Sequence, residues 1–261
     1  GLPEDYCQVL IADDSVAEQL ATDPRIAFLS FIGSAKVGWY LRSKIAPGTR
    51  CALEHGGVAP VIVDKDANLK DLLPAIIKGA FYHAGQVCVS VQRLYINEQI
   101  VNEVTGALAE YARELVVGNP LNEATAIGPL ISNLEVERVH NWVQEAIQEG
   151  ANIVGGGKKL SESCYAPTIL LNPSKDSKVS QLEIFGPVLC IYSYKNMDEA
   201  ITQANSLSFN FQAAVFTENI NTAMKASKAL NASAVMINDH TAFRADWMPF
   251  RGKNQSGLGT G

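Results

Sequence analysis

The chain of 261 residues is long enough to bury a substantial hydrophobic core, in one large domain or two modest ones. Hydrophobic residues make up 47% of it and charged residues 18%, which excludes a disordered, collagen-like or coiled-coil protein. With 21 basic against 27 acidic residues the net charge is −6, so neither nucleic acid nor an anionic membrane surface is an expected partner. A protein that acts on a small molecule is the better expectation.

The five cysteines are spaced widely, at positions 7, 51, 88, 164 and 190, and none belongs to a C-x-x-C pair. This spacing predicts neither a disulfide framework nor a zinc site, so we expect no metal and a reducing compartment such as the cytoplasm. No apolar run approaches the roughly 20 residues of a membrane helix. The N-terminus also lacks the basic and then apolar order of a signal peptide.

The N-terminal part of the chain predicts two strands around one helix. The apolar stretch 26–32 indicates a strand, and Gly33 and Ser34 then form a turn before a helix that includes residues 37–41. A short extended segment follows at 50–53.

The next two segments each contain a proline. The β-branched run 58–63 is interrupted by Pro60, which predicts a poor central strand because proline lacks the N–H group that a ladder needs. Residues 68–84 have helical periodicity and should end at Gly85, with Pro74 tolerable only in or near the first turn.

The rest of the chain alternates between the two kinds of element. We expect helices at 98–116, 134–149, 197–206 and 219–230, and strands at 91–97, 187–194, 212–216 and 234–238. Asn133 is the expected cap of the second of these helices, and residues 155–157 form a glycine-rich surface loop. The alternation predicts an α/β layer fold with parallel strands.

Cys88 stands between a predicted helix and a predicted strand. A cysteine in such a turn, beside ordered backbone N–H groups, can have its thiolate stabilised and act as a nucleophile. The alternative is a buried small hydrophobic residue, as most free cysteines are. His83 lies five residues away but would point away from the turn on a helix, so we do not expect a Cys–His pair.

Two further segments have alternative interpretations. Glu54 ends an apolar strand and precedes Gly56 and Gly57, a position suited to a general base or simply to a solvated carboxylate. The turn at Gly33 and Ser34 offers N–H groups to a phosphate, although an ordinary helix cap has the same residues.

The segment 183–187 combines an acid, an aromatic ring and a rigid turn in Glu183, Phe185 and Pro187. Carboxylates suit ribose hydroxyls and aromatic rings suit flat heterocycles. An ordinary turn before a strand is the alternative.

Taken together and in this order, these segments resemble motifs of the aldehyde dehydrogenase superfamily. The matching segments are 31–38 (cofactor loop), 53–57 (glutamate motif), 85–88 (nucleophile motif), 183–187 (nicotinamide-ribose motif), and 249–250 with 256–259 (C-terminal signature). The likeness spans essentially the whole chain.

The resemblance implies oxidation of an aldehyde to a carboxylic acid with NAD or NADP. In that reading the Cys88 thiolate attacks the carbonyl carbon, and the resulting thiohemiacetal passes a hydride to the nicotinamide. Glu54 then activates the water that hydrolyses the thioester.

The resemblance also implies roles for the other site residues. On the cofactor side these are Gly33 and Ser34 at the pyrophosphate, His55 through its backbone carbonyl, Glu183 at the nicotinamide ribose and Phe185 against the nicotinamide. On the substrate side they are Gln86, Phe250 and Arg244.

The implied architecture is a three-layer catalytic domain at 55–246 beside an incomplete Rossmann-like cofactor domain. Residues 1–54 and the returning segment 247–261 form the partial cofactor domain, which stops before the family's oligomerisation strand. Family members carry a long N-terminal part that includes an oxyanion-hole asparagine, so we expect a fragment with weak or absent activity alone. In the full-length protein we expect a homo-dimer or tetramer.

Two positions depart from the family pattern. His55 stands where leucine is usual, and because the family uses mainly the backbone carbonyl there, we expect the change to be tolerated with altered solvation. Arg251 stands where glycine is usual. Together with Arg244, Arg251 favours a phosphorylated or carboxylated aldehyde, the alternative being two solvated surface arginines.

Three rival functions stay open at this point. One is a CoA-acylating dehydrogenase, against which Glu54 argues because that type needs no water-activating base. The second is a catalytically silent binding or structural fragment. The third is a cofactor-independent esterase that uses Cys88 and Glu54.

Overall fold

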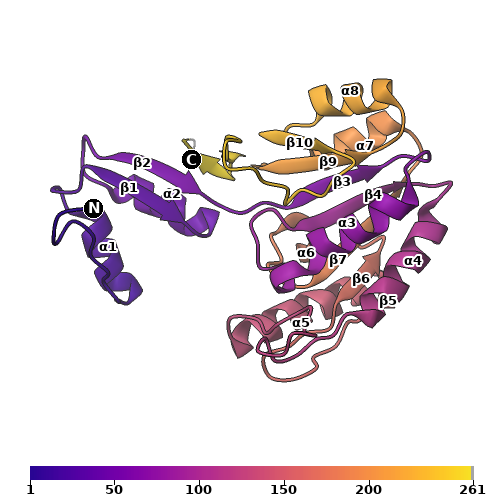
Figure 1. Cartoon of the computed structure of the whole chain (residues 1–261), viewed down its shortest axis with the longest axis horizontal. Helices are drawn as coiled ribbons and strands as arrows, with labels where there is room; N and C mark the ends of the chain where they lie inside the picture. The colour runs from indigo at the N-terminus through magenta and orange to yellow at the C-terminus, as the bar shows by residue number, and fades with distance from the viewer. Residues whose placement is uncertain (260–261) are drawn as a thin grey trace.

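A computed structural model of the chain describes residues 1–259 as a small N-terminal lobe beside a large α/β lobe (Figure 1). Thr260 and Gly261, the end of the predicted return segment, lie outside the described residues. The strands are β1 (Phe28–Ile32), β2 (Arg50–Glu54), β3 (Ala59–Val63), β4 (Val91–Asn97), β5 (Asn152–Gly155), β6 (Thr168–Leu171), β7 (Val188–Tyr194), β8 (Phe209–Asn210), β9 (Gln212–Phe216), β10 (Ala234–Ile237), β11 (Lys253–Asn254) and β12 (Gly257–Leu258). The helices are α1 (Asp14–Thr22), α2 (Ala35–Lys44), α3 (Leu69–Phe81), the 3-10 turn η1 (Tyr82–Gly85), α4 (Val101–Glu114), α5 (Asn133–Gln148), α6 (Lys178–Gln181), α7 (Met197–Ala204) and α8 (Ile220–Ala229).

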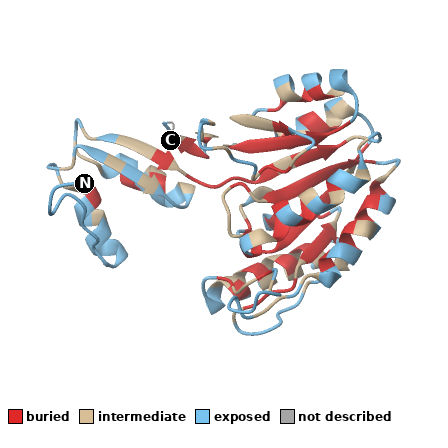
Figure 2. Cartoon of the chain, in the orientation of Figure 1, coloured by how far each residue is buried: buried red, intermediate tan, exposed pale blue. Residues whose placement is uncertain are grey.

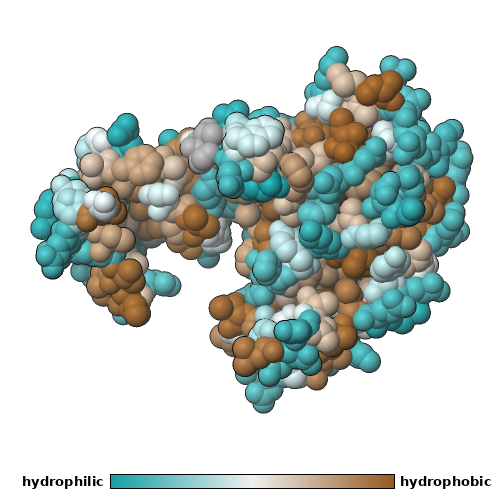
Figure 3. Space-filling view, viewed as in Figure 1, coloured by the Kyte–Doolittle hydropathy of each residue, from teal (hydrophilic) through white to brown (hydrophobic). Residues whose placement is uncertain are grey.

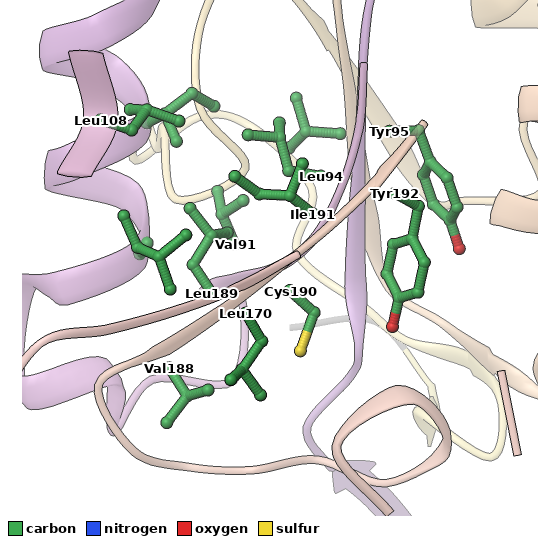
Figure 4. Packing of buried hydrophobic residues seen from close by; sticks show 14 of the residues in the cluster. Val91, Leu94, Tyr95, Leu108, Leu170, Val188, Leu189, Cys190, Ile191 and Tyr192 are labelled. Atoms are coloured by element: carbon green, nitrogen blue, oxygen red, sulfur yellow. The ribbon is translucent and has the colours of Figure 1, made fainter. Parts of the chain in front are cut away.

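The large lobe is built on a seven-stranded sheet in the order β10-β9-β3-β4-β7-β6-β5. All neighbours run parallel except β5, which is antiparallel to β6. Successive residues of β4 point to opposite faces, so Leu94 lies on the side of Leu108 in α4 while Tyr95 stacks on Tyr192 on the other side (Figure 4). Helices α3 and α4 cover the first face and α7 packs on the second, which makes the predicted three-layer α/β fold.

The small lobe has its own three-stranded sheet, in the order β1-β2-β12. Strand β1 is parallel to β2, and β12 returns from the far end of the chain to pair antiparallel with β2. Most residues of its strands are half-buried or exposed, whereas those of the large sheet are mostly buried (Figure 2). The main hydrophobic core therefore sits in the large lobe.

The expectation that Pro60 makes a poor central strand was wrong. Strand β3 lies in the interior of the large sheet, between β9 and β4. Pairing with β9 begins only at Val61, and the register with β4 shifts between Ala59 and Pro60. The proline is therefore at the irregular start of the strand, where its missing N–H is not required.

The predicted helix 68–84 ends earlier than expected, at Phe81. It is followed by the turn η1, in which His83, Ala84 and Gly85 all have positive φ angles of 49°, 56° and 70°. A Cβ on Gly85 would overlap the backbone oxygen of Gly186, so the turn is pressed directly against the 183–187 segment. The contact between these two segments explains the change of direction.

Smaller differences concern caps and short elements. Helix α5 is capped by Ser132, whose side chain accepts a hydrogen bond from the Glu135 N–H, instead of by Asn133. The predicted 187–194, 197–206, 219–230 and 234–238 segments match β7, α7, α8 and β10 to within two residues. The sequence did not reveal α1, β5 or β6. Within residues 1–259, no helix is both long and apolar enough to span a membrane.

Candidate functional site

Cys88 follows the tight turn η1 and precedes the central strand β4. Its backbone oxygen lies 3.6 Å from the position of a Cβ on Gly57, so the nucleophile loop rests on the chain just after Glu54. The thiol is half-buried and takes part in no disulfide with any described residue. The fold therefore brings the predicted nucleophile motif against the predicted glutamate motif.

Glu54 ends β2, where its backbone oxygen accepts a hydrogen bond from the N–H of Gly33 at 3.1 Å. Its Oε2 is buried and forms no hydrogen bond with the residues that the structure describes. Burial raises the pKa of the Glu54 carboxyl, and the positive charge of Arg244 partly opposes that rise. A carboxylate without a partner and with a raised pKa is suited to accept a proton.

Glu183 reaches the same place from the loop before β7. Its Oε1 accepts a hydrogen bond from the N–H of Gly57 at 3.2 Å. A Cβ on Gly56 would overlap the Glu183 carboxylate, so only glycine leaves this side chain its space. Burial raises the pKa of Glu183 to about 7, with the Gly57 N–H and the charge of Arg138 acting in the opposite direction.

The expected stabilisation of the Cys88 thiolate is outweighed in the described residues. Burial, followed by the negative charges of Glu183 and Glu54, raises the pKa of Cys88 to about 11, and only a backbone N–H acts in the opposite direction. The thiol is therefore protonated at neutral pH in this arrangement. For the Cys88 thiol to act as a nucleophile, the two carboxylates must be neutralised or must move away. Alternatively, positive charge or N–H donors must be brought close to the thiolate.

His55 is buried beneath helix α2. Its Nδ1 lies 2.9 Å from the backbone oxygen of Gln255, which can only accept, so Nδ1 carries the hydrogen. Nε2 faces Gly38, where a Cβ would overlap it, and it has no hydrogen-bond partner among residues 1–259. The ring packs edge-on against Trp39 and Phe31.

The cofactor-loop residues Gly33 and Ser34 lead into α2. The Ser34 side chain accepts a hydrogen bond from the N–H of Val37 at 3.4 Å and caps the helix. Beside them a cavity of about 640 Å³ opens between α1, β1 and α2. Residues that line it include Leu20, Ile26, Phe28, Leu29, Val37 and Leu41. On the outer surface of this lobe apolar and polar side chains are mixed (Figure 3).

Phe250 and Arg244 come together in the segment after β10. The Arg244 guanidinium carbon lies 4.5 Å from the centre of the Phe250 ring, and Nη1 donates to the backbone oxygen of Met248 at 3.1 Å. Phe250 packs on Phe211 at 4.7 Å between ring centres. The Phe211 Cβ lies 3.3 Å from the position of a Cβ on Gly57, which the Cys88 backbone oxygen also approaches. The segment after β10 is therefore close to the nucleophile loop.

Gln86, the predicted substrate contact, is hydrogen-bonded within the protein. Its amide nitrogen donates to the backbone oxygens of His83 and Pro129, and its amide oxygen accepts from the N–H of Ile131. Both ends of the amide are therefore engaged by the protein. Gln86 fixes the nucleophile loop to the loop before α5.

Phe185 is 40% exposed and has a positive φ of 48°. For a bulky residue this left-handed backbone is uncommon, and it presents the ring outward at the turn that Gly85 contacts. An exposed ring beside Glu183 is free to cover a ligand.

One position was missed by the sequence interpretation. Phe211, in the segment between β8 and β9, links Phe250 to Gly57, and its aromatic character alone gave no signal. Ser256, the first residue of the predicted 256–259 signature, is fully buried. Its hydroxyl accepts from the N–H of Asn210, and its backbone oxygen accepts from the N–H of His55. In the described part of the chain, no group of three or more His, Cys, Asp or Glu side chains is arranged to hold a metal ion.

Comparison with known proteins adds independent information. A sequence profile described as "Aldehyde dehydrogenase family" matches residues 1–261. The 3-sulfolactaldehyde dehydrogenase of Priestia megaterium is 41% identical over 260 residues, which are 99% of this chain and 54% of that protein. A lactaldehyde dehydrogenase of Methanococcus maripaludis is 39% identical over 246 residues, 94% of this chain and 52% of that protein.

Solved structures have the same fold. The glyceraldehyde-3-phosphate dehydrogenase of Methanocaldococcus jannaschii, solved with NADP, superposes with a TM-score of 0.90 at 40% identity. The match covers 94% of this chain and 53% of that structure. The chain thus spans about half the length of the relatives it matches.

Proposed function

The chain belongs to the aldehyde dehydrogenase family, and on that premise we propose that it carries the nucleophile and the base of an enzyme that oxidises an aldehyde to a carboxylic acid. The observation that carries the proposal is the meeting of Cys88, Glu54 and Glu183 from three separate segments. Gly57 is the common neighbour: its N–H donates to Glu183 Oε1, and the Cys88 backbone oxygen lies 3.6 Å from the position of a Cβ on it. Glu54 ends β2 three residues before Gly57.

Cys88 is proposed to act first. Its sulfur, as the thiolate, adds to the aldehyde carbon, a C–S bond forms, and the carbonyl oxygen becomes an alkoxide. NAD or NADP, held by Glu183 and Phe185, would supply the hydride acceptor for that carbon, and its loss of hydride would leave a thioester on Cys88.

Glu54 is proposed to complete the reaction. Its unpartnered Oε2 takes a proton from water, and the water oxygen attacks the thioester carbon. The C–S bond breaks, the acid departs, and Cys88 leaves as the thiolate. The raised pKa of Glu54 makes it a stronger base than an exposed carboxylate.

The residues around the cavity fit a dinucleotide. Apolar side chains between α1, β1 and α2 suit a flat ring, and the first turn of α2 at Ser34 suits a phosphate. Glu183 and Phe185 would hold the ribose and the ring at the reactive end, and the backbone carbonyl of His55 would complete the contact. Gly56 supports this proposal because it lets the Glu183 carboxylate lie against the main chain.

The domain division follows from the same proposal. We assign residues 55–246 to the catalytic domain, and 1–54 with 247–261 to part of the cofactor domain. The chain spans about half the length of its matched relatives, so the activity is proposed for the whole protein. A homo-dimer or tetramer belongs to this proposal, and the open edge of β10 in the large sheet supports it.

An absorbance assay for NADH or NADPH tests the proposal, with short aldehydes on the natural-length protein. We expect aldehyde-dependent turnover that Cys88→Ser abolishes. Glu54→Gln should leave the first turnover visible as a burst and slow the steady state, because it removes only the base for hydrolysis. Turnover that survives Cys88→Ser would contradict the proposal. A 4-nitrophenyl ester without cofactor, run in parallel, separates this activity from simple esterase action.

A further inference from the structure

We infer that Arg244 is a specificity-determining residue that recognises an anionic group on the aldehyde, so that the preferred substrates carry a carboxylate, sulfonate or phosphate. This inference deepens the proposed function and rests on it. Two properties of the Arg244 guanidinium support it, namely its position and its unused hydrogen-bond donors.

The Arg244 side chain is exposed yet held in place. The guanidinium lies over the Phe250 ring at 4.5 Å, and one N–H donates to the backbone oxygen of Met248. An arginine that stacks on an aromatic face while bonding to the main chain has lost much of its rotamer freedom before any ligand arrives. Such a group loses little further entropy on binding an anion.

The position of Arg244 is on the side of the reacting groups. Its charge acts on the Glu54 carboxyl. A series of contacts joins Arg244 to Phe250 and Phe250 to Phe211. The Phe211 Cβ lies 3.3 Å from the position of a Cβ on Gly57, and the Cys88 backbone oxygen lies 3.6 Å from the same position. These contacts place the Arg244 segment beside the nucleophile loop.

Arg244 also has no acidic partner of its own. Among the ion pairs formed by residues 1–259, none includes Arg244, and its remaining N–H groups form no hydrogen bond there. The neighbouring Asp246 is exposed and is not paired with it. Because guanidinium presents a planar fork of donors, a carboxylate, sulfonate or phosphate oxygen pair matches it better than a neutral hydroxyl does.

Glu54 does not satisfy this cation either. Its buried Oε2 forms no hydrogen bond in the described part of the chain, so the two side chains influence each other only through the electric field. The Glu54 carboxylate therefore remains available to accept a proton from water, and the Arg244 guanidinium remains available to bind a substrate anion. Arg251 is a second exposed arginine of the same segment, and the sequence paired it with Arg244. Within residues 1–259 its guanidinium has neither the aromatic stacking nor the main-chain hydrogen bond that hold Arg244 in place, so the inference does not extend to Arg251, which serves as the matched control.

The test measures kcat/KM for paired aldehydes on the natural-length protein. The pairs are succinic semialdehyde against butanal, 3-sulfolactaldehyde against lactaldehyde, and glyceraldehyde 3-phosphate against glyceraldehyde. We expect selectivity for at least one anionic member, and we expect Arg244→Ala to reduce that ratio about 10- to 100-fold, as for a charge-assisted hydrogen bond. Arg244→Lys should retain part of the ratio, and Arg251→Ala should leave it unchanged.

Two outcomes would overturn the inference while the proposed function survives. One is a wild-type protein that oxidises both members of every pair equally well. The other is an Arg244→Ala variant that slows both members by the same factor, because Arg244 then acts only on the pKa of Glu54. The ratio within a pair separates these effects, since a change in the base affects both members alike.

A second measurement keeps the inference testable if no aldehyde is oxidised. The rate of Cys88 alkylation by iodoacetamide is followed by mass spectrometry with and without succinate, 3-sulfolactate or 3-phosphoglycerate. We expect at least one of these anions to protect Cys88 from alkylation. Protection that is lost in Arg244→Ala and kept in Arg251→Ala supports the anion site even if dehydrogenase activity is absent. Equal alkylation with and without every anion contradicts it.

Discussion

The carboxylate of Glu183 occupies the space that a Cβ atom on Gly56 would require. Residue 183 comes from the loop before β7 and residue 56 from the link between the two sheets. The contact therefore joins the two segments that are proposed to hold the cofactor and the base.

Gly56→Ala should displace the Glu183 side chain, because the overlapping atoms are at its flexible end. The Gly57 N–H then loses its acceptor, and we expect the free energy of unfolding to fall by about 1–3 kcal/mol. Urea denaturation measures this value. In a Glu183→Ala background the penalty of Gly56→Ala should shrink, and an undiminished penalty would mean that another contact is responsible. Gly106→Ala is the control, since no atom lies within 4 Å of its Cβ and alanine suits helix α4.

The raised pKa of Glu183 predicts a specific pH dependence of stability. The carboxyl titrates near 7 in the folded chain against its ordinary 4.5, so the folded state holds this proton more tightly. The free energy of unfolding should therefore fall as the pH rises from about 4.5 to 7, by up to about 3 kcal/mol from this group at about 1.4 kcal/mol per pKa unit. Glu183→Gln should flatten the profile in this window. A variant profile parallel to that of the wild type would contradict the assignment.

Alkylation of Cys88 should become faster when the neighbouring negative charges are removed. Glu183→Gln and Glu54→Gln each lower the pKa of the thiol, with the larger effect expected for Glu183, whose charge raises it more. Iodoacetamide labelling at pH 8, resolved by peptide mass spectrometry, gives the rate at each cysteine. The exposed Cys7 serves as the internal reference and should react equally in all variants. Unchanged labelling of Cys88 would show that burial alone sets its pKa.

His55→Leu should stabilise the chain by about 1 kcal/mol. The substitution removes a buried Nε2 that lacks a hydrogen-bond partner, and it removes the bond from Nδ1 to Gln255, whose exposed backbone segment can bind water instead. Leucine has a similar volume, so the space beside Gly38 stays filled. Thermal or urea unfolding tests this expectation, and His55→Ala provides the contrast because it leaves a cavity and should destabilise by about 2–4 kcal/mol. A marked loss of stability in His55→Leu would mean that a ligand or water satisfies Nε2.

The central elements could be predicted from the sequence because their patterns are strong. The expected strands 91–97 and 212–216 coincide with β4 and β9. The order of the motifs also pointed to the family that the sequence profile confirms. These features depend on runs of β-branched residues and on local glycine turns, which can be recognised from the sequence alone.

Distant contacts decide the features that the sequence could not show. Pro60 is tolerated because β9 begins to pair one residue later, which no local pattern shows. Gln86 turns to the 129–131 loop, more than forty positions away in the chain. The pKa of Cys88 depends on Glu183, which arrives from almost a hundred residues downstream. In each case the missing information was the identity of a neighbour brought in by the fold.

The link between β2 and β3 joins the two sheets over residues 55–58, all of them buried. Glu54 ends a strand of the small sheet, whereas Cys88 lies three residues before the start of a strand of the large one. Any rocking of one lobe against the other must therefore change the separation of base and nucleophile. The reaction rate should therefore depend on the angle between the two lobes. A crosslink between the lobes, placed far from both residues, should change that rate.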